Sequence, residues 1–194
     1  MKKNIYYSLL ISAMVSVSAA EETRQVDKHE HGVGELNIAI EGNAIDFEFF
    51  IPGADIVGFE YEAKTESDIA LVNAALEKFG NFDNIFSLPE SSNCNLVNSE
   101  IGVNQDDDHD DHDEHDEHDE HDDHDDHDEE AHNEFVAHYS FNCENIKEID
   151  RISFPYFTNF PNSGELEVQF VSEKGSTGFE VEGDEPFIDL KGKI

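Results

Sequence analysis

The sequence has few basic residues and lacks the motifs of common enzymes, and each scarcity excludes a class of function. It has 11 Lys and Arg against 47 Asp and Glu, which gives a formal net charge of -36. A surface this acidic argues against binding to nucleic acid or to anionic membranes, and it favours small cations. The chain has no His-Glu-x-x-His, no phosphate-binding loop and no Ser/His/Asp grouping with a local signature. The sequence therefore predicts a protein that is not an enzyme.

Long apolar runs are absent except near the amino terminus. Lys2 and Lys3 precede an apolar run over residues 5–17, and Ser18-Ala19-Ala20 offers a small-residue cleavage site. This order is typical of a secretory signal peptide over residues 1–20, with cleavage after Ala19 as the alternative. A membrane anchor is disfavoured because the run is too short to span a bilayer comfortably. We expect a protein that is exported to a bacterial periplasm and is not itself embedded in a membrane.

The densest feature is a tract over residues 106–130 that consists only of Asp, Glu and His. It holds 18 carboxylates and seven histidines, and the histidines recur at every third position: His109, His112, His115, His118, His121, His124 and His127. This composition is typical of metal-capturing segments. Without metal, the repulsion between like charges predicts a disordered insertion.

The ligand types in this tract suit borderline divalent metals, and zinc is the first expectation because metal availability, not ligand chemistry, usually decides between them. Imidazole and carboxylate together suit Zn²⁺, Ni²⁺ and Cu²⁺, whereas two Met and no spare thiolate argue against Cu⁺. Calcium would use the carboxylates but leave the histidines without a role. Histidines three apart lie roughly 5–6 Å from each other on an α-helix and can then share an ion. We expect several weak, overlapping Zn²⁺ sites, with Ni²⁺ or Cu²⁺ as alternatives, and weaker capture below neutral pH because protons compete for the imidazoles.

The only two cysteines, Cys94 and Cys143, lie on either side of this tract. Export makes a disulfide the first expectation, and an oxidising compartment disfavours the alternative of two thiolate metal ligands. We expect the bridge to join the two sides of the tract at its base.

Hydrophobic periodicity predicts a single α+β domain, made from residues 21–105 and 131–194 around the insertion, with mostly antiparallel, hairpin-connected strands and two helices. The clearest elements are a hairpin with a turn at Gly42-Asn43 and a helix over residues 68–79, capped by Thr65 or Ser67 and ended by Gly80. Weaker patterns predict further short elements: strands at 85–88, 95–97, 135–141 and 166–170, a helix at 146–152, and a second hairpin that turns at Gly175-Ser176 into 177–181.

Histidines outside the tract are further candidate ligands. His29 and His31 are two apart, so on an extended chain they point the same way, roughly 7 Å from each other. Both could reach one ion, or both could be solvated on a loose terminus. His138 falls on the opposite face of its predicted strand from Phe135 and Tyr139.

Several stretches resemble the periplasmic zinc-binding proteins of the ZrgA/ZevA type. They are residues 29–39 (HEHGVGELNIA), 52–60 (PGADIVGFE), 139–143 (YSFNC) and 166–169 (LEVQ), together with the acidic His-rich insertion. The resemblance implies a periplasmic protein that assists zinc uptake alongside an inner-membrane permease. It also implies that His29 and His31 form an amino-terminal histidine motif, that the tract is a His-rich loop, and that His132 is the histidine leading into the next strand.

The candidate ligands are therefore His29, His31, the seven tract histidines, His132 and His138. For His138 the alternative is a core histidine held by a hydrogen bond. The alternatives for the whole protein are a metal-sensing accessory subunit that regulates a permease, or a buffer for nickel or copper(II).

Overall fold

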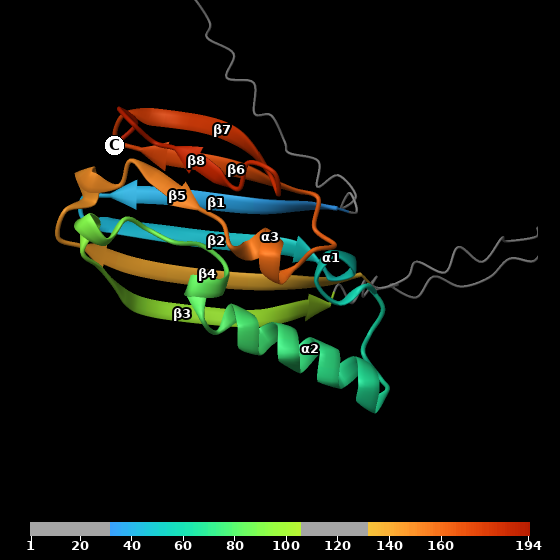
Figure 1. The fold of residues 1–194 in the computed structure, drawn as a ribbon. Helices are drawn as coiled ribbons and strands as arrows, with labels where there is room; N and C mark the ends of the chain where they lie inside the picture. Colours follow the sequence, from blue (N-terminus) through green and yellow to red (C-terminus); the bar gives the residue numbers. More distant parts are fainter. Residues whose placement is uncertain (1–31, 106–131) are drawn as a thin grey trace, which may run out of the picture.

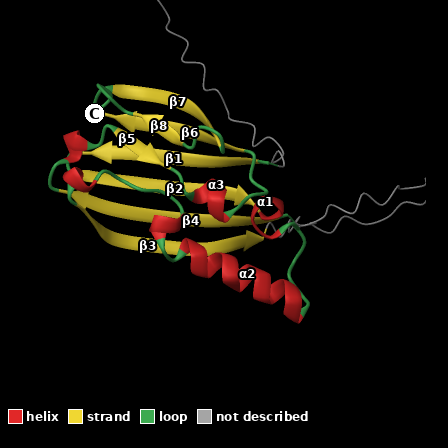
Figure 2. Ribbon diagram, in the orientation of Figure 1, coloured by secondary structure: helices red, strands yellow, loops and turns green. Residues whose placement is uncertain are grey.

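The computed structural model describes residues 32–105 and 132–194, which form a six-stranded sheet with helices on one side (Figures 1 and 2). The main sheet contains β1 (Val33–Glu41), β2 (Ala44–Pro52), β3 (Cys94–Gln105), β4 (Asn133–Cys143), β6 (Glu165–Ser172) and β7 (Gly175–Glu182). A small second sheet pairs β5 (Arg151–Ser153) with β8 (Phe187–Asp189), and the helices are α1 (Gly53–Val57), α2 (Glu66–Phe79) and α3 (Tyr156–Asn159). The predicted signal peptide, His29, His31 and the tract lie outside the described residues.

The main sheet is mixed. Its strand order is β3-β4-β2-β1-β6-β7. Strand β1 pairs in parallel with β6, whereas the other neighbours pair antiparallel. The α+β class is confirmed, but the prediction of mostly antiparallel, hairpin-connected strands misses the parallel pairing of β1 with β6.

The first hairpin follows from its sequence. Leu36, Ile38 and Ile40 alternate with polar or small residues, so a strand buries them on one face. Glu41 pairs with Ala44, which leaves Gly42-Asn43 as a two-residue turn, and Gly42 has a positive φ of 59°. This turn is the predicted one, because glycine adopts such a conformation without steric cost.

Helix α2 is also close to its prediction. The Thr65 hydroxyl accepts the Asp68 backbone N–H at 3.1 Å, and the Gly80 N–H donates to the Leu76 carbonyl at 2.9 Å. The predicted apolar stripe is only partly buried: Phe79 is 1% exposed, but Ile69 is 44% exposed. The buried residues of α2, Ala75 and Phe79, therefore both lie in its carboxyl-terminal half.

An aromatic cluster forms the core between the sheet and the elements that cover it. Phe86, from the loop after α2, stacks on Phe47 with ring centroids 4.0 Å apart, and its ring meets Tyr139 edge-on at 5.4 Å. The Tyr139 hydroxyl donates to the Phe79 carbonyl at 2.6 Å, and burial raises the pKa of this phenol above its usual range. The cluster thus ties the covering segment 79–86 to β2 and β4.

Three weaker expectations are wrong in detail. Residues 146–152 form one 3-10 turn (Ile146–Glu148) followed by β5, and not a helix. Residues 85–88 contribute a single bridge, between Ser87 and Ser153. The second hairpin turns at Glu173-Lys174, two residues before the predicted position, because Ser172 pairs with Gly175.

The disulfide between Cys94 and Cys143 is present, but it does not lie at the base of the insertion. Cys94 pairs with Cys143 at one end of the β3–β4 ladder, and Gln105 pairs with Asn133 at the other end, where the insertion begins. The bridge therefore secures the two strands at the end remote from the tract.

The face of the main sheet opposite the core, here called the open face, is acidic. Register places the outward-pointing strand residues of all six strands on it. Among these described strand residues there is no Lys or Arg, whereas the carboxylates are Glu35, Glu41, Asp46, Glu48, Glu100, Glu134, Glu165, Glu167, Glu180 and Glu182.

Candidate metal-binding side chains

The points where the described chain starts and is interrupted lie at one end of the main sheet, beside α1 (Figure 1). Gly32 is the first described residue, and its backbone N–H donates to Asp55 Oδ1 of α1 at 2.9 Å. The insertion leaves the sheet at Gln105 and returns at Asn133, its register partner on β4. Both segments that carry predicted ligands are therefore attached to the same end of the fold.

His132 lies at this end of the sheet, and one of its ring nitrogens contacts the carboxylate of Glu60. Its Nδ1 lies 2.6 Å from Glu60 Oε2. The His132 side chain is 53% exposed, whereas the Glu60 side chain is 13% exposed. The carboxylate is thus mostly enclosed by protein, and much of the imidazole faces solvent.

Asn133 joins the backbone next to His132 to the backbone of Glu60 and Tyr61 by hydrogen bonds. Its N–H donates to the Glu60 carbonyl at 2.8 Å, and its side-chain amide donates to the Tyr61 carbonyl at 3.0 Å. Asn133 is only 3% exposed and packs against Gly53, where a Cβ would lie 1.6 Å from Asn133 Oδ1. A side chain at Gly53 would therefore displace the asparagine that joins β4 to the segment after α1.

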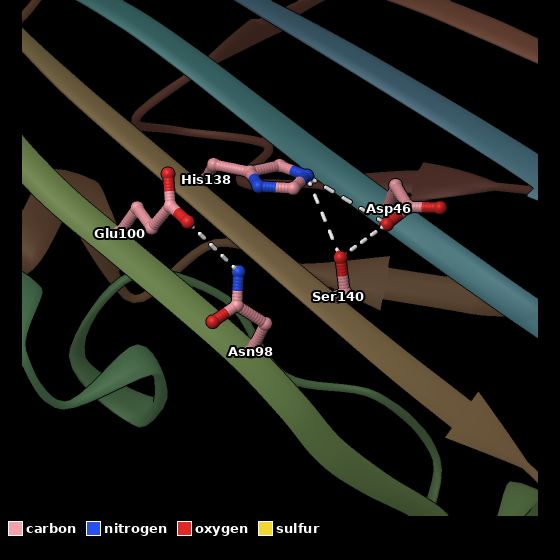
Figure 3. A network of polar contacts seen from close by, with 5 residues as sticks. All are labelled: Asp46, Asn98, Glu100, His138 and Ser140. Carbon is pink, nitrogen blue, oxygen red and sulfur yellow. Dashed lines mark hydrogen bonds and ion pairs between the residues drawn. The ribbon is translucent and has the colours of Figure 1, made fainter.

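His138 lies midway along β4 on the open face, and its side chain is 32% exposed, so the alternative of a core histidine is wrong (Figure 3). Its Nε2 is 3.6 Å from Asp46 Oδ1 and 3.5 Å from Ser140 Oγ, and the Ser140 hydroxyl donates to Asp46. Glu48 on β2 and Glu100 on β3 are its direct neighbours across the strands. One imidazole thus lies beside three carboxylates from β2 and β3, the two strands that flank β4.

The His138 network does not have the order of a nucleophilic triad. In a triad, the serine and the carboxylate contact opposite nitrogens of the imidazole. Here the same nitrogen faces both groups, and the serine donates directly to Asp46. His138 is therefore not placed to activate the hydroxyl of Ser140 as a nucleophile.

The two histidines do not assemble a closed metal site with the other described residues. Within residues 32–105 and 132–194, no three His, Cys, Asp or Glu side chains lie close enough together to hold a metal ion. His132 and His138 stay predicted ligands, as do His29, His31 and the tract histidines, which lie outside that part of the chain.

Sequence reasoning missed the carboxylates beside these histidines. The position of Asp46 near His138 could in principle have been predicted, because β2 and β4 alternate strongly and their register places Asp46 opposite Ser140. Glu60 closes the stretch 52–60 that carries the family resemblance, but its contact with His132 spans 72 residues of sequence. No local pattern signals a pairing over that distance.

The fold and these side chains define a small acidic β-sheet protein with solvent-facing histidines beside carboxylates. The chain belongs to the ZrgA family of zinc uptake proteins, whose pattern it matches over residues 28–190. This match confirms the resemblance found in the sequence. The family is a family of zinc uptake proteins and not an enzyme family. No curated protein matches the chain in sequence. None of the helices within residues 32–105 and 132–194 is long and apolar enough to cross a membrane.

Proposed function

We propose that this protein binds zinc in the periplasm through its His-rich insertion and assists the import of the metal by an inner-membrane permease. The observation that carries the proposal is the position of the insertion in a zinc uptake fold. It interrupts the β3–β4 hairpin at the end where His132 faces solvent. Zinc captured by the tract would therefore be gathered beside a histidine of the folded part.

Charge supports capture by the tract. The insertion carries 18 carboxylates, and it is attached to a sheet whose open face carries ten more. Among the described strand residues of that face there is no Lys or Arg. A surface of one sign raises the local concentration of counter-ions. The seven histidines then supply the preference for borderline metals over calcium.

The disulfide supports the periplasmic location. Cys94 and Cys143 are the only cysteines in the sequence, and they are bonded to each other. Structural disulfides persist in oxidising compartments and are rare in the cytosol. Since no thiolate is left to bind metal, the ligands are imidazoles and carboxylates.

Calorimetric titration tests the proposal. Zn²⁺, Ni²⁺, Cu²⁺ and Ca²⁺ are added separately to the mature protein, to a form lacking residues 106–130, and to a matched form in which the seven tract histidines are Asn. The Asn form keeps the length and all 18 carboxylates of the tract. We expect it to lose several equivalents of zinc while its calcium binding stays the same. Equal zinc stoichiometry in all three forms would refute the role of the tract.

The same titration separates a buffer from the alternative of a sensor subunit. A buffer takes up several equivalents with graded affinity and little change in the folded part. A sensor shows a large conformational change at one equivalent, because a ligand shifts a two-state equilibrium only through its differential affinity. Circular dichroism recorded along the titration distinguishes these outcomes.

A further inference from the structure

The contact between Glu60 and His132 fixes which nitrogen of the imidazole is available to a ligand. An ionised carboxylate only accepts hydrogen bonds, and a neutral imidazole carries one N–H. With Oε2 of Glu60 2.6 Å from Nδ1, the proton of neutral His132 resides on Nδ1. The lone pair then lies on Nε2, in a side chain that is 53% exposed.

The surroundings of Glu60 favour one orientation of this pair. Exposed ion pairs between flexible side chains contribute little, because both partners must lose conformational freedom. Here the Glu60 side chain is 13% exposed, and its own carbonyl is bonded to the residue that follows His132. The buried Asn133 amide adds a second bond, to Tyr61. The hydrogen bonds between Asn133 and residues 60–61 thus hold the backbone of both Glu60 and His132 in place.

We propose that Glu60 is a positioning residue for zinc, which acts by presenting Nε2 of His132 to the ion. The inference rests on the proposed function, and it names a group that sequence reasoning did not select. Histidines that bind metal commonly donate their other N–H to a carboxylate, which sets the tautomer, orients the ring and makes the nitrogen more basic. Loss of such a partner typically lowers metal affinity about 10- to 100-fold.

Nitrogen NMR of the histidine side chains tests this role in the full mature chain. The His132→Asn variant assigns the His132 signals by their disappearance. In the wild type we expect the tautomer protonated on Nδ1, with Nε2 shifting on addition of Zn²⁺. In Glu60→Ala the tautomer preference should be lost, and the zinc concentration that half-shifts the His132 signal should rise about 10- to 100-fold. Glu60→Gln keeps an acceptor oxygen, so it should keep the tautomer and bind with intermediate affinity.

Glu62→Ala is the matched control. It removes the same charge two residues away, from a side chain that pairs with Lys64 at 2.8 Å and not with His132. We expect the His132 signals and their zinc response to stay as in the wild type. If Glu62→Ala and Glu60→Ala weaken the response equally, the effect is general charge loss and the positioning role is overturned.

The failure of this inference is distinguishable from that of the proposed function. If the His132 signal responds to zinc equally in the wild type and in Glu60→Ala, Glu60 has no positioning role, although the protein still binds zinc. If total zinc uptake is absent in the wild type, the proposed function fails and the inference fails with it. A lower melting temperature of Glu60→Ala with an unchanged zinc response would indicate a structural role and would also overturn the proposal.

Discussion

Removal of the bridge between Cys94 and Cys143 is expected to cost about 4 kcal/mol of stability. The two cysteines are separated by 49 residues in sequence and are register partners at the end of the β3–β4 ladder. In the chain-entropy model, a cross-link stabilises the fold by restricting the unfolded chain, and the effect grows with the logarithm of the loop length. Most of the 49 residues belong to β3, β4 and the insertion between them.

The tract provides an internal check on this magnitude. Deleting residues 106–130 removes 25 residues and so halves the loop that the bridge closes. Halving a loop changes its closure entropy by only about 0.6 kcal/mol. The bridge should therefore be worth about 3.5 kcal/mol in the shortened protein. The acidic tract would then have little influence on what the disulfide contributes.

Urea denaturation measures both values, with the oxidised protein compared against Cys94→Ala/Cys143→Ala in the intact and the shortened chain. A metal chelator must be present, so that zinc bound to the tract does not add to the stability of the folded state. Alanine is the suitable replacement because Cys143 is fully buried and a serine would bury a hydroxyl. Equal midpoints for the bridged and unbridged proteins would show that the entropic reasoning is wrong here.

Three further predictions follow from the packing and the buried tyrosine. Phe86→Ala should cost about 3–5 kcal/mol in urea denaturation, since the ring is fully buried and stacks on Phe47; a loss under 1 kcal/mol would contradict its central place in the core. Gly53→Ala should cost about 1–3 kcal/mol by overpacking against Asn133, and its melting temperature would be unchanged only if that asparagine could move freely. Burial raises the pKa of Tyr139 in the folded state. The contribution of this phenol to the free energy of unfolding is therefore fully present below pH 10, about the pKa of tyrosine in the unfolded chain. That contribution is lost as the pH rises from there through the folded-state pKa. Tyr139→Phe should therefore flatten the fall of stability with pH above 10, and an equally steep fall would exclude this phenol as the cause.

Local signals explain which elements were predictable. The β1–β2 hairpin and helix α2 are specified by residues close in sequence: a Gly-Asn turn, a threonine cap and a glycine stop. Strand β3 was recognised only over residues 95–97, although it continues to Gln105. As an edge strand it has little to bury, and a register shift between Leu96 and Asn98 interrupts its alternation. The parallel pairing of β1 with β6 joins segments from opposite ends of the chain, which no short pattern encodes.

The candidate ligands show the same division. Alternation in β4 was enough to place His138 away from the core, and the structure confirms that face. The groups that surround it could not be predicted, because Asp46, Glu48 and Glu100 reach it only through the strand order. Glu60 depends in the same way on the return of the chain at Asn133. Residue types indicated the chemistry, whereas topology decides which side chains act together.

The acidic open face has a consequence for thermal-shift measurements on this protein. Neighbouring strands are about 4.8 Å apart, which is less than the Debye length of about 8 Å at physiological ionic strength. Carboxylates on adjacent strands therefore repel one another, and any added electrolyte should raise the melting temperature by relieving that repulsion. A rise caused by zinc thus contains a share that magnesium at equal ionic strength would also produce, and only the remainder reports binding by histidine.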